Sequence, residues 1–273
     1  MKFKVALCQM DVVADKEANL AKAEAMIREA AASGADIAAL PEMFNCPYSN
    51  DHFPEYAEAE SGETTRRLSA AAKEHGIYLV GGTIPERSGA AIYNTCFTFD
   101  RNGHQIGKHR KIHLFDIDIK GGVRFKESDI LGRGHQITVV DTEFCRIGIA
   151  ICYDMRFPEL IRLMALKGAQ LIMVPGAFNM TTGPAHWELT MRARALDNQV
   201  YFAAISPARN MDAAYHAYGN SGIVNPWGEF SGKTDEKESI VYATVDLDHV
   251  KAIREQLPLL QHRREDIYKI EEL

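Results

Sequence analysis

The chain has 273 residues, of which 46% are hydrophobic and 25% are charged, with a formal net charge of −6 and a pI of about 5.9. This is the composition of a globular protein with a sizeable core, and the acidic balance argues against a general nucleic-acid or anionic-membrane binder. We expect neither a signal peptide, because the N-terminal apolar segment is short, nor a membrane helix, which requires roughly 18 unbroken apolar residues.

Hydrophobic periodicity predicts alternating strands and helices in the first part of the chain. It predicts a strand at residues 4–9, an alanine-rich helix at 16–33 that ends at Gly34, and a strand at 37–40 that ends at Pro41. A helix at 64–75 and a strand at 77–81 come next. Residues 91–111 indicate two strands joined by a turn at 100–103.

The same alternation continues in the second part. The predicted elements are a strand at 147–151, a helix at 158–167, a strand at 171–174, a helix at 187–198 and a strand at 200–206. The segment SGIVNPWGE, residues 221–229, is a strand that runs into a turn, and a strand at 240–246 precedes a charged tail. Because no linker or break in composition interrupts this order, we predict a single α/β domain over residues 1–273.

Two segments repeat one pattern. SGADIAALPEMF, residues 33–44, and KGAQLIMVPGAF, residues 167–178, each follow a helix, run as an apolar strand and stop at a proline before a phenylalanine. The repeat is either a chance feature of an α/β protein or the mark of two similar halves related by a pseudo-twofold axis. In the second case Glu42 lies just beyond a strand end, where side chains project into a site.

Cys152 stands out among the five cysteines. In GIAICYDMRFPEL, residues 148–160, an apolar strand ends at this cysteine and a helix follows, which is the layout of a nucleophile elbow. We expect a helix end to lower the pKa of the thiol and to leave backbone N–H groups for an oxyanion. The alternative is a buried structural cysteine, which we expect for Cys8, Cys96 and Cys145. The cysteines are odd in number and form no CxxC pair, which favours free thiols in a reducing cytoplasm.

A cysteine nucleophile needs a base and a positive charge. No histidine has a turn context like that of Cys152, so Glu42 is the candidate base, with a solvated loop glutamate as the alternative. Lys111, in GKHRKIH at residues 107–113, precedes an apolar segment and is predicted to point inward as a fixed charge, unless the run is merely a solvated basic patch. Metal binding by His109 and His113 is disfavoured, because their spacing aligns two ligands on a helix and the segment resembles strand and loop.

These three positions carry a resemblance. LPEMF around Glu42, HRKIHLFD around Lys111 and GIAICYDMRFPEL around Cys152 resemble the Glu, Lys and Cys motifs of the nitrilase superfamily of carbon–nitrogen hydrolases, in the same order. PGAFNMTTGPAHWEL, RARALDNQVYF, SPARN and NPWGE are similar to segments of its Nit2-like omega-amidase branch. The likeness covers residues 3–268, and the loop DIKGGVRFKESDIL, residues 118–131, matches less well before Phe125.

The resemblance implies a fold, an assembly and a reaction. It implies a four-layer α-β-β-α sandwich with pseudo-twofold halves and a homodimer or higher homo-oligomer, with the tail from about residue 255 and the helix after Cys152 at the interface. It also implies a further acidic residue, Glu127, which holds Lys111 and the substrate amide. Glu42 is then the base, Cys152 forms a thioester, and Lys111 with the Tyr153 backbone N–H binds the oxyanion, without a metal or organic cofactor.

The same resemblance implies a small-molecule amide as substrate, namely a short dicarboxylate monoamide such as 2-oxoglutaramate or 2-oxosuccinamate. Candidate binding residues are Tyr48, His113, Arg156 and Phe178, although Arg156 is equally explained as a structural ion-pair partner. Other nitrilase-superfamily activities, such as a nitrilase or an N-carbamoyl-amino-acid hydrolase, would use the same three residues. A binding protein on a retired hydrolase scaffold and a thiol-redox protein are the remaining alternatives, and no resolving cysteine lies near Cys152 in the sequence.

Overall fold

The computed structural model describes residues 1–118, 120 and 124–273, so part of the loop at residues 118–131 lies outside the described residues. Within this range the strands form a larger sheet, a smaller sheet and a separate hairpin. The larger sheet contains β1 (Lys2–Gln9), β2 (Ile37–Ala39), β3 (Tyr78–Val80), β4 (Ile84–Ser88), β5 (Ala91–Phe99), β6 (Gln105–Arg110), β9 (Leu131–Gly132) and β16 (Ser239–Asp246). The smaller sheet contains β10 (Thr138–Asp141), β11 (Arg146–Ile149), β12 (Ala169–Pro175), β13 (Tyr201–Ile205), β14 (Gly222–Val224) and β15 (Phe230–Lys233), and the hairpin joins β7 (Asp116–Asp118) to β8 (Arg124–Lys126).

The helices connect these strands. They are α1 (Lys16–Ala32), α2 (Phe53–Tyr56), α3 (Glu63–His75), α4 (Pro158–Leu166), α5 (Gly183–Asn198) and α6 (Leu247–Gln256), with short 3₁₀ helices at Glu127–Asp129 and Cys152–Arg156. The boundaries of α1 follow from the residues at its two ends. The Asp15 side chain accepts a hydrogen bond from the backbone N–H of Ala18 at 3.1 Å, and Gly34 takes a left-handed conformation with φ of 77° beyond the last turn.

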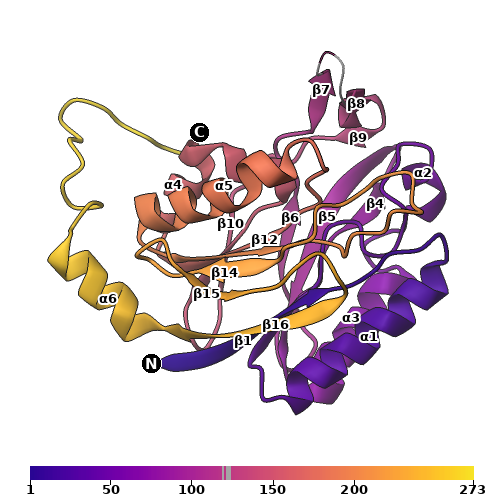
Figure 1. The fold of residues 1–273 in the computed structure, drawn as a ribbon, viewed down its shortest axis with the longest axis horizontal. Coiled ribbons are helices and arrows are strands. Elements are labelled where there is room, and N and C mark those ends of the chain that lie inside the picture. Colours follow the sequence, from indigo (N-terminus) through magenta and orange to yellow (C-terminus); the bar gives the residue numbers. More distant parts are fainter. Residues whose placement is uncertain (119, 121–123) are drawn as a thin grey trace.

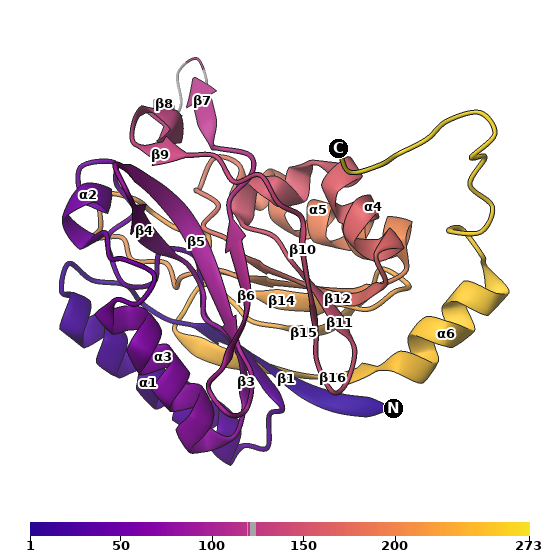
Figure 2. The same cartoon turned by 180° about the vertical axis from the view of Figure 1, so that it is seen from behind.

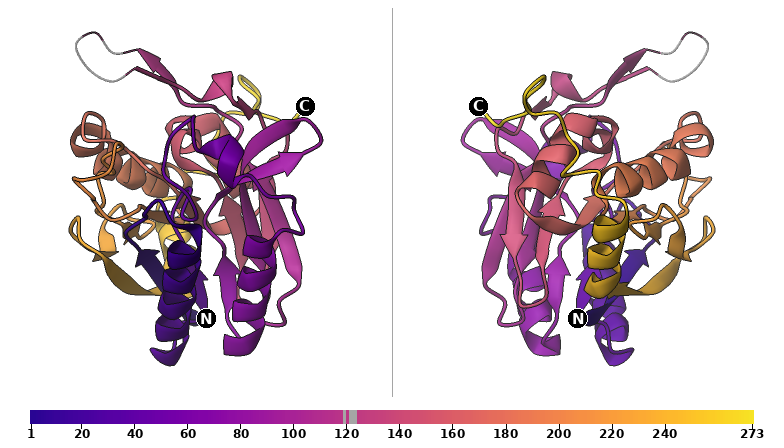
Figure 3. Two further views of the ribbon diagram at one scale, coloured as in Figure 1. Left: turned by 90° about the vertical axis from the view of Figure 1, so that its right-hand side faces the viewer. Right: turned by 90° about the vertical axis from the view of Figure 1, so that its left-hand side faces the viewer.

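The two sheets pack face to face and the helices cover their outer faces. Val5 and Leu7 of β1 belong to the same buried cluster as Ile147 and Ile149 of β11, so the inner faces of both sheets share one core. Helices α1 and α3 lie outside the larger sheet, and α4 and α5 lie outside the smaller one (Figures 1 and 3). The predicted α-β-β-α sandwich is therefore confirmed.

The two repeated segments take equivalent places in the two halves. In the first, α1 leads into β2, which lies between the parallel neighbours β1 and β3. In the second, α4 leads into β12, which lies between the parallel neighbours β11 and β13. The carboxyl ends of parallel strands are where a fold of this class places its site. A site is therefore expected at the residues just beyond β2, β11, β12 and β13.

Some predicted features differ from the structure. The prediction of a charged tail directly after residue 246 is wrong, because Leu247–Gln256 forms α6, which buries Val250 and Ile253 and is capped by the Asp246 carboxylate. The segment after α6 returns to α4 and α5, as Figure 2 shows, and Glu272 there pairs with Lys167. Periodicity also fails to predict β4, β10 and β15, because such short strands carry too few alternating residues. No helix in the described ranges is long and apolar enough to cross a membrane.

Candidate active site

Cys152 sits at a sharp turn between the smaller sheet and the helices outside it. Strand β11 ends at Ile149, and Cys152 opens a 3₁₀ helix with a φ of 46°, a left-handed conformation that is strained for a residue with a Cβ. The side chain is buried, with the residue only 3% exposed. Strain of this kind is held in place by surrounding contacts and is typical of a functional turn.

Glu42 approaches the same place from the larger sheet. It follows β2 and the Leu40–Pro41 pair, and its side chain is completely buried. Its Oε1 accepts hydrogen bonds from Lys111 Nζ at 2.9 Å and from Asn94 Nδ2 at 2.8 Å, while its Oε2 accepts one from the backbone N–H of Ala177 at 2.7 Å. These donors fix the carboxylate in one orientation.

Lys111 lies between two carboxylates. Its Nζ is 2.9 Å from Glu42 Oε1 and 2.9 Å from Glu127 Oε1, and all three side chains are 0% exposed. Glu127 begins the short 3₁₀ helix after β8, and its Oε2 accepts a hydrogen bond from the Phe115 backbone N–H at 2.7 Å. The structure thus brings Lys111 together with Glu42 and Glu127, and Cys152 lies near enough for the charges of Glu42 and Lys111 to act on its thiol.

Burial and charge set the protonation of these groups. Burial raises the pKa of Glu42 above its ordinary value, against the opposing charge of Lys111. Burial by itself lowers the pKa of Lys111. The negative charges of Glu127 and Glu42 have a larger opposite effect, so the lysine pKa lies well above its ordinary value. Lys111 is therefore a permanent cation, and Glu42 is a carboxylate with an increased affinity for a proton.

The expectation that a helix end lowers the pKa of Cys152 is wrong. Burial, followed by the nearby charge of Glu42, raises the pKa of this thiol well above its ordinary value, and Lys111 only partly opposes the shift. The helix that begins at Cys152 is a short 3₁₀ helix, and α4 starts only at Pro158, so the thiol does not lie at the N-terminus of an α-helix. This environment therefore favours the neutral thiol over the thiolate.

The backbone around Cys152 is held by Asp154, a residue to which the sequence alone assigned no role. Its buried carboxylate accepts hydrogen bonds from the backbone N–H groups of Ile151 at 3.1 Å and His113 at 2.9 Å. It also contacts His109 Nε2 at 3.2 Å and His113 Nδ1 at 2.8 Å. Asp154 thereby links the nucleophile turn to the segment that follows Lys111. The Tyr153 backbone N–H lies in the first turn of the same 3₁₀ helix, directly after Cys152.

His109 and His113 are both engaged by the buried Asp154 carboxylate. The His113 ring also stacks on Phe157 with ring centroids 3.6 Å apart. No group of three metal-ligating side chains exists among the residues that the structure describes. His113, a predicted substrate-binding residue, is instead engaged through Nδ1 with Asp154.

The other predicted binding residues lie close by. The Tyr48 hydroxyl donates a hydrogen bond to Glu127 Oε1 at 2.6 Å, so it belongs to the buried charge network. The Arg156 guanidinium lies over the Phe178 ring, 4.4 Å from its centroid, and Nη1 is 3.0 Å from His186 Nδ1. Its buried Nε has no partner among the described residues, and Nη1 contacts a histidine instead of a carboxylate. The interpretation of Arg156 as a structural ion-pair partner is therefore not supported.

Tyr215 is a further neighbour that sequence reasoning missed, because the irregular loop between β13 and β14 has no periodic pattern. Its ring centroid is 4.6 Å from that of Tyr48, and its hydroxyl donates a hydrogen bond to the Ala177 carbonyl at 2.5 Å. Burial raises the pKa of Tyr215 well above its ordinary value, and the nearby charges of Cys152 and Glu42 add to this effect. Tyr215 therefore covers the site from the side of that loop.

Comparison with known proteins places this geometry in a family. The family model for carbon-nitrogen hydrolases matches residues 4–255. The chain belongs to the carbon–nitrogen hydrolase family. It is 54% identical over 271 residues to "Omega-amidase NIT2" of Xenopus tropicalis, covering 99% of this chain and 98% of that one. It is 51% identical over 269 residues to "Omega-amidase NIT2" of Homo sapiens, covering 98% of each.

A solved structure agrees with this assignment. The crystal structure of Saccharomyces cerevisiae Nit3, described as a member of branch 10 of the nitrilase superfamily, matches with a TM-score of 0.89 and 43% identity. The match covers 96% of this chain and 97% of that one. This carbon–nitrogen hydrolase therefore has the nitrilase-type fold and belongs to the Nit2-like branch, which confirms the resemblance found in the sequence.

Proposed function

We propose that Glu42, Lys111 and Cys152 form a catalytic Glu-Lys-Cys triad that hydrolyses a linear amide. The observation that carries this proposal is the buried Glu42–Lys111–Glu127 network beside the strained turn of Cys152, where burial raises the pKa of both the thiol and the Glu42 carboxylate. Such a pair transfers a proton at the moment of attack instead of holding a free thiolate. Glu42 takes the proton from Cys152 as the sulfur attacks the amide carbonyl.

The remaining steps use the same groups. The oxygen that becomes negative in the tetrahedral intermediate is held by the Lys111 ammonium and by the Tyr153 backbone N–H. Glu42 then gives its proton to the leaving nitrogen, the carbon–nitrogen bond breaks, and a thioester and ammonia result. A water molecule that gives its proton to Glu42 attacks the thioester and releases the acid and the thiol. Glu127 acts as a positioning residue, because it holds Lys111 from the side opposite Glu42.

The substrate we propose is a short dicarboxylate monoamide, such as 2-oxoglutaramate or 2-oxosuccinamate, which makes the protein an omega-amidase. Identity of 50–54% over nearly the whole chain to proteins named omega-amidases supports this substrate class. Arg156 adds support from the site itself, because it is a cation near Cys152 without a carboxylate partner among the described residues. A substrate carboxylate would supply that partner.

Steady-state kinetics test this proposal. We expect kcat/KM for 2-oxoglutaramate or 2-oxosuccinamate to exceed that for a neutral amide of equal length by about 10- to 100-fold, because the neutral analogue leaves the partly buried Arg156 guanidinium without a carboxylate partner. An aliphatic nitrile and an N-carbamoyl amino acid complete the panel. A faster reaction with either compound would contradict the omega-amidase assignment and favour a nitrilase or a carbamoyl-amino-acid hydrolase. Absence of any turnover would favour a binding protein on a retired scaffold.

We also propose a homodimer or higher homo-oligomer, in which the outer surface of α4 and α5 and the tail from about residue 255 meet a second copy. The apolar side chains Leu189 and Leu196 of α5 are 68% and 40% exposed, and Tyr268 in the tail is 53% exposed. A partner that covers these side chains removes apolar surface from water. Sedimentation at the assay concentration tests this assembly, and an active monomer would contradict it.

The cellular setting we propose is the cytoplasm. All five cysteines are buried and free, as expected of thiols kept in a reducing compartment. The proposed reaction uses only side chains, one backbone amide and water, so we expect activity to persist after treatment with a metal chelator. If the chelator abolished activity and zinc or another divalent metal restored it, the result would contradict a cofactor-free mechanism.

A further inference from the structure

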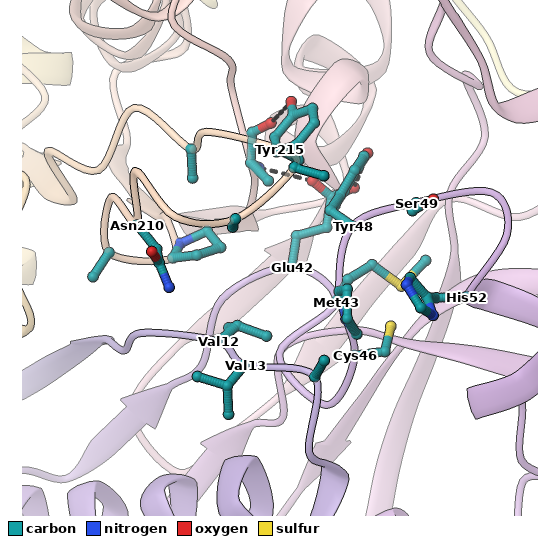
Figure 4. A pocket seen from close by; sticks show the side chains of 18 of the residues that line it. Val12, Val13, Glu42, Met43, Cys46, Tyr48, Ser49, His52, Asn210 and Tyr215 are labelled. Carbon is teal, nitrogen blue, oxygen red and sulfur yellow. Dashed lines mark hydrogen bonds between the residues drawn. The ribbon is translucent and has the colours of Figure 1, made fainter.

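A cavity of about 490 Å³ lies beside the candidate active site. Figure 4 shows it between the loop that carries Glu42, the segment with Val12 and Val13 after β1, and the loop with Asn210 after β13. Its wall is mostly apolar, and it shares Glu42, Ala177, Tyr48 and Tyr215 with the site. Cys152 does not line the cavity.

Two tyrosine rings separate the cavity from the nucleophile. The rings of Tyr48 and Tyr215 lie next to one another at the end of the Glu42 side chain, with centroids 4.6 Å apart (Figure 4). Tyr48 is tied to Glu127 by its hydroxyl at 2.6 Å, and Tyr215 is tied to the Ala177 carbonyl at 2.5 Å. Cys152 itself is only 3% exposed and does not line the cavity.

The proposed role of Glu42 puts the leaving group on the cavity side of the site. Glu42 must reach the amide nitrogen to protonate it, and Glu42 lines the cavity. Arg156, which we propose as the partner of the substrate carboxylate, does not line it, and neither does Phe178, on whose ring the Arg156 guanidinium lies. A substituent on the amide nitrogen would therefore point past Glu42 toward the cavity and meet the rings of Tyr48 and Tyr215 first.

We propose that Tyr215 is a specificity-determining residue that restricts the leaving group to ammonia by closing the site toward this cavity. The proposal rests on the proposed amidase function. For an N-substituted amide the chemistry would be the same: sulfur bonds to the carbonyl carbon, the carbon–nitrogen bond breaks, and the thiol proton passes through Glu42 to the departing amine. The two kinds of substrate differ in the volume they require, because an N-alkyl group needs the volume that the Tyr215 ring occupies. Tyr48 is the less suitable position to vary, since its hydroxyl belongs to the buried charge network.

The test compares succinamate with N-propylsuccinamate, measured by release of succinate, which both compounds yield. We expect the wild-type enzyme to prefer succinamate by at least about 100-fold in kcat/KM, the size of effect that a steric boundary gives. Tyr215→Ala should lower this preference at least tenfold, by gaining activity on the N-propyl compound. Tyr215→Phe keeps the ring and should retain the wild-type preference. Val13→Ala enlarges the same cavity without changing the Tyr48 and Tyr215 rings. This variant should also retain the wild-type preference.

An unchanged preference in Tyr215→Ala would overturn the proposal. A second measurement does not depend on turnover: alkylation of Cys152 by iodoacetamide and by its N-propyl derivative, followed by mass spectrometry. The ratio of the two rates should fall at least tenfold in Tyr215→Ala, and an unchanged ratio would likewise overturn the proposal. If the wild-type enzyme releases no succinate from succinamate, the amidase function fails on its own, and the alkylation ratio still decides the role of Tyr215 as a steric boundary.

Discussion

Replacing Lys111 by methionine should destabilise the protein and stop catalysis for two separable reasons. Lys111 Nζ lies 2.9 Å from a carboxylate on either side, and all three side chains are inaccessible to solvent. Methionine fills nearly the same volume but leaves Glu42 and Glu127 facing each other without a cation. Breaking a buried ion pair in this way costs about 3 to 5 kcal/mol of unfolding free energy. For a chain of this size that corresponds to a decrease in Tm of roughly 5 to 20 °C.

The destabilisation should depend on pH. Without Lys111 the principal influence that lowers the pKa of Glu42 is gone, so its folded-state pKa lies further above the unfolded value of about 4.3. A group with a raised folded-state pKa contributes stability below the unfolded value and loses it as the pH rises through the folded value. The difference in unfolding free energy between Lys111→Met and the wild-type protein should therefore be larger at pH 8 than at pH 5, as measured by urea denaturation.

A second substitution separates stability from chemistry. Glu127→Gln removes one of the facing charges, so the double variant Lys111→Met, Glu127→Gln should regain part of the lost stability. It should remain inactive, because the charge that holds the oxyanion is still absent, which typically costs about 10²- to 10³-fold in kcat. Wild-type stability of Lys111→Met at pH 8, or recovery of activity in the double variant, would refute the reasoning.

Four further outcomes are expected. Cys152→Ala should abolish hydrolysis with little change in Tm, and acid-quenched wild-type enzyme should carry an acyl adduct by intact-mass spectrometry; full activity of the variant would exclude a Cys152 thioester. Because burial raises the pKa of Glu42, kcat/KM should fall on acidification with a midpoint above about 4.3, and a lower midpoint would exclude Glu42 as the base. Arg156→Met should raise KM for a dicarboxylate monoamide but not for a neutral amide, and equal changes for both would argue against carboxylate binding. Hydrogen bonds from the histidines hold the pKa of the buried Asp154 well below its usual range, so its contribution to stability is present above the unfolded value of about 3.9 and lost on further acidification. Asp154→Asn should therefore be less stable than wild type at pH 7 and approach it below pH 4 in denaturation experiments, and a constant difference would argue against this role.

The local sequence determined most of the elements and the candidate residues. Apolar runs closed by proline or glycine predicted β2, β12 and α4, because periodicity reports directly which face of an element is buried. Polar residues directly beyond such runs, Glu42 and Cys152 among them, were recognisable as candidates because folds of this class place their site at the carboxyl ends of the strands. The family resemblance then added Glu127, which no local pattern distinguishes from a surface glutamate.

Only the tertiary structure decided how these residues act on each other. Lys111 and Glu42 are 69 positions apart in the chain, and their contact depends on how the strands of the larger sheet are ordered. The pKa of Cys152 depends on burial and on the charge of Glu42, so a local rule about helix ends predicted the wrong direction. Tyr215 lies in a loop without periodicity, and its position over the site follows from contacts with Tyr48 and Ala177. Sequence patterns report the environment of one element at a time, whereas charge, access and proton transfer at this site arise from contacts between elements of both sheets.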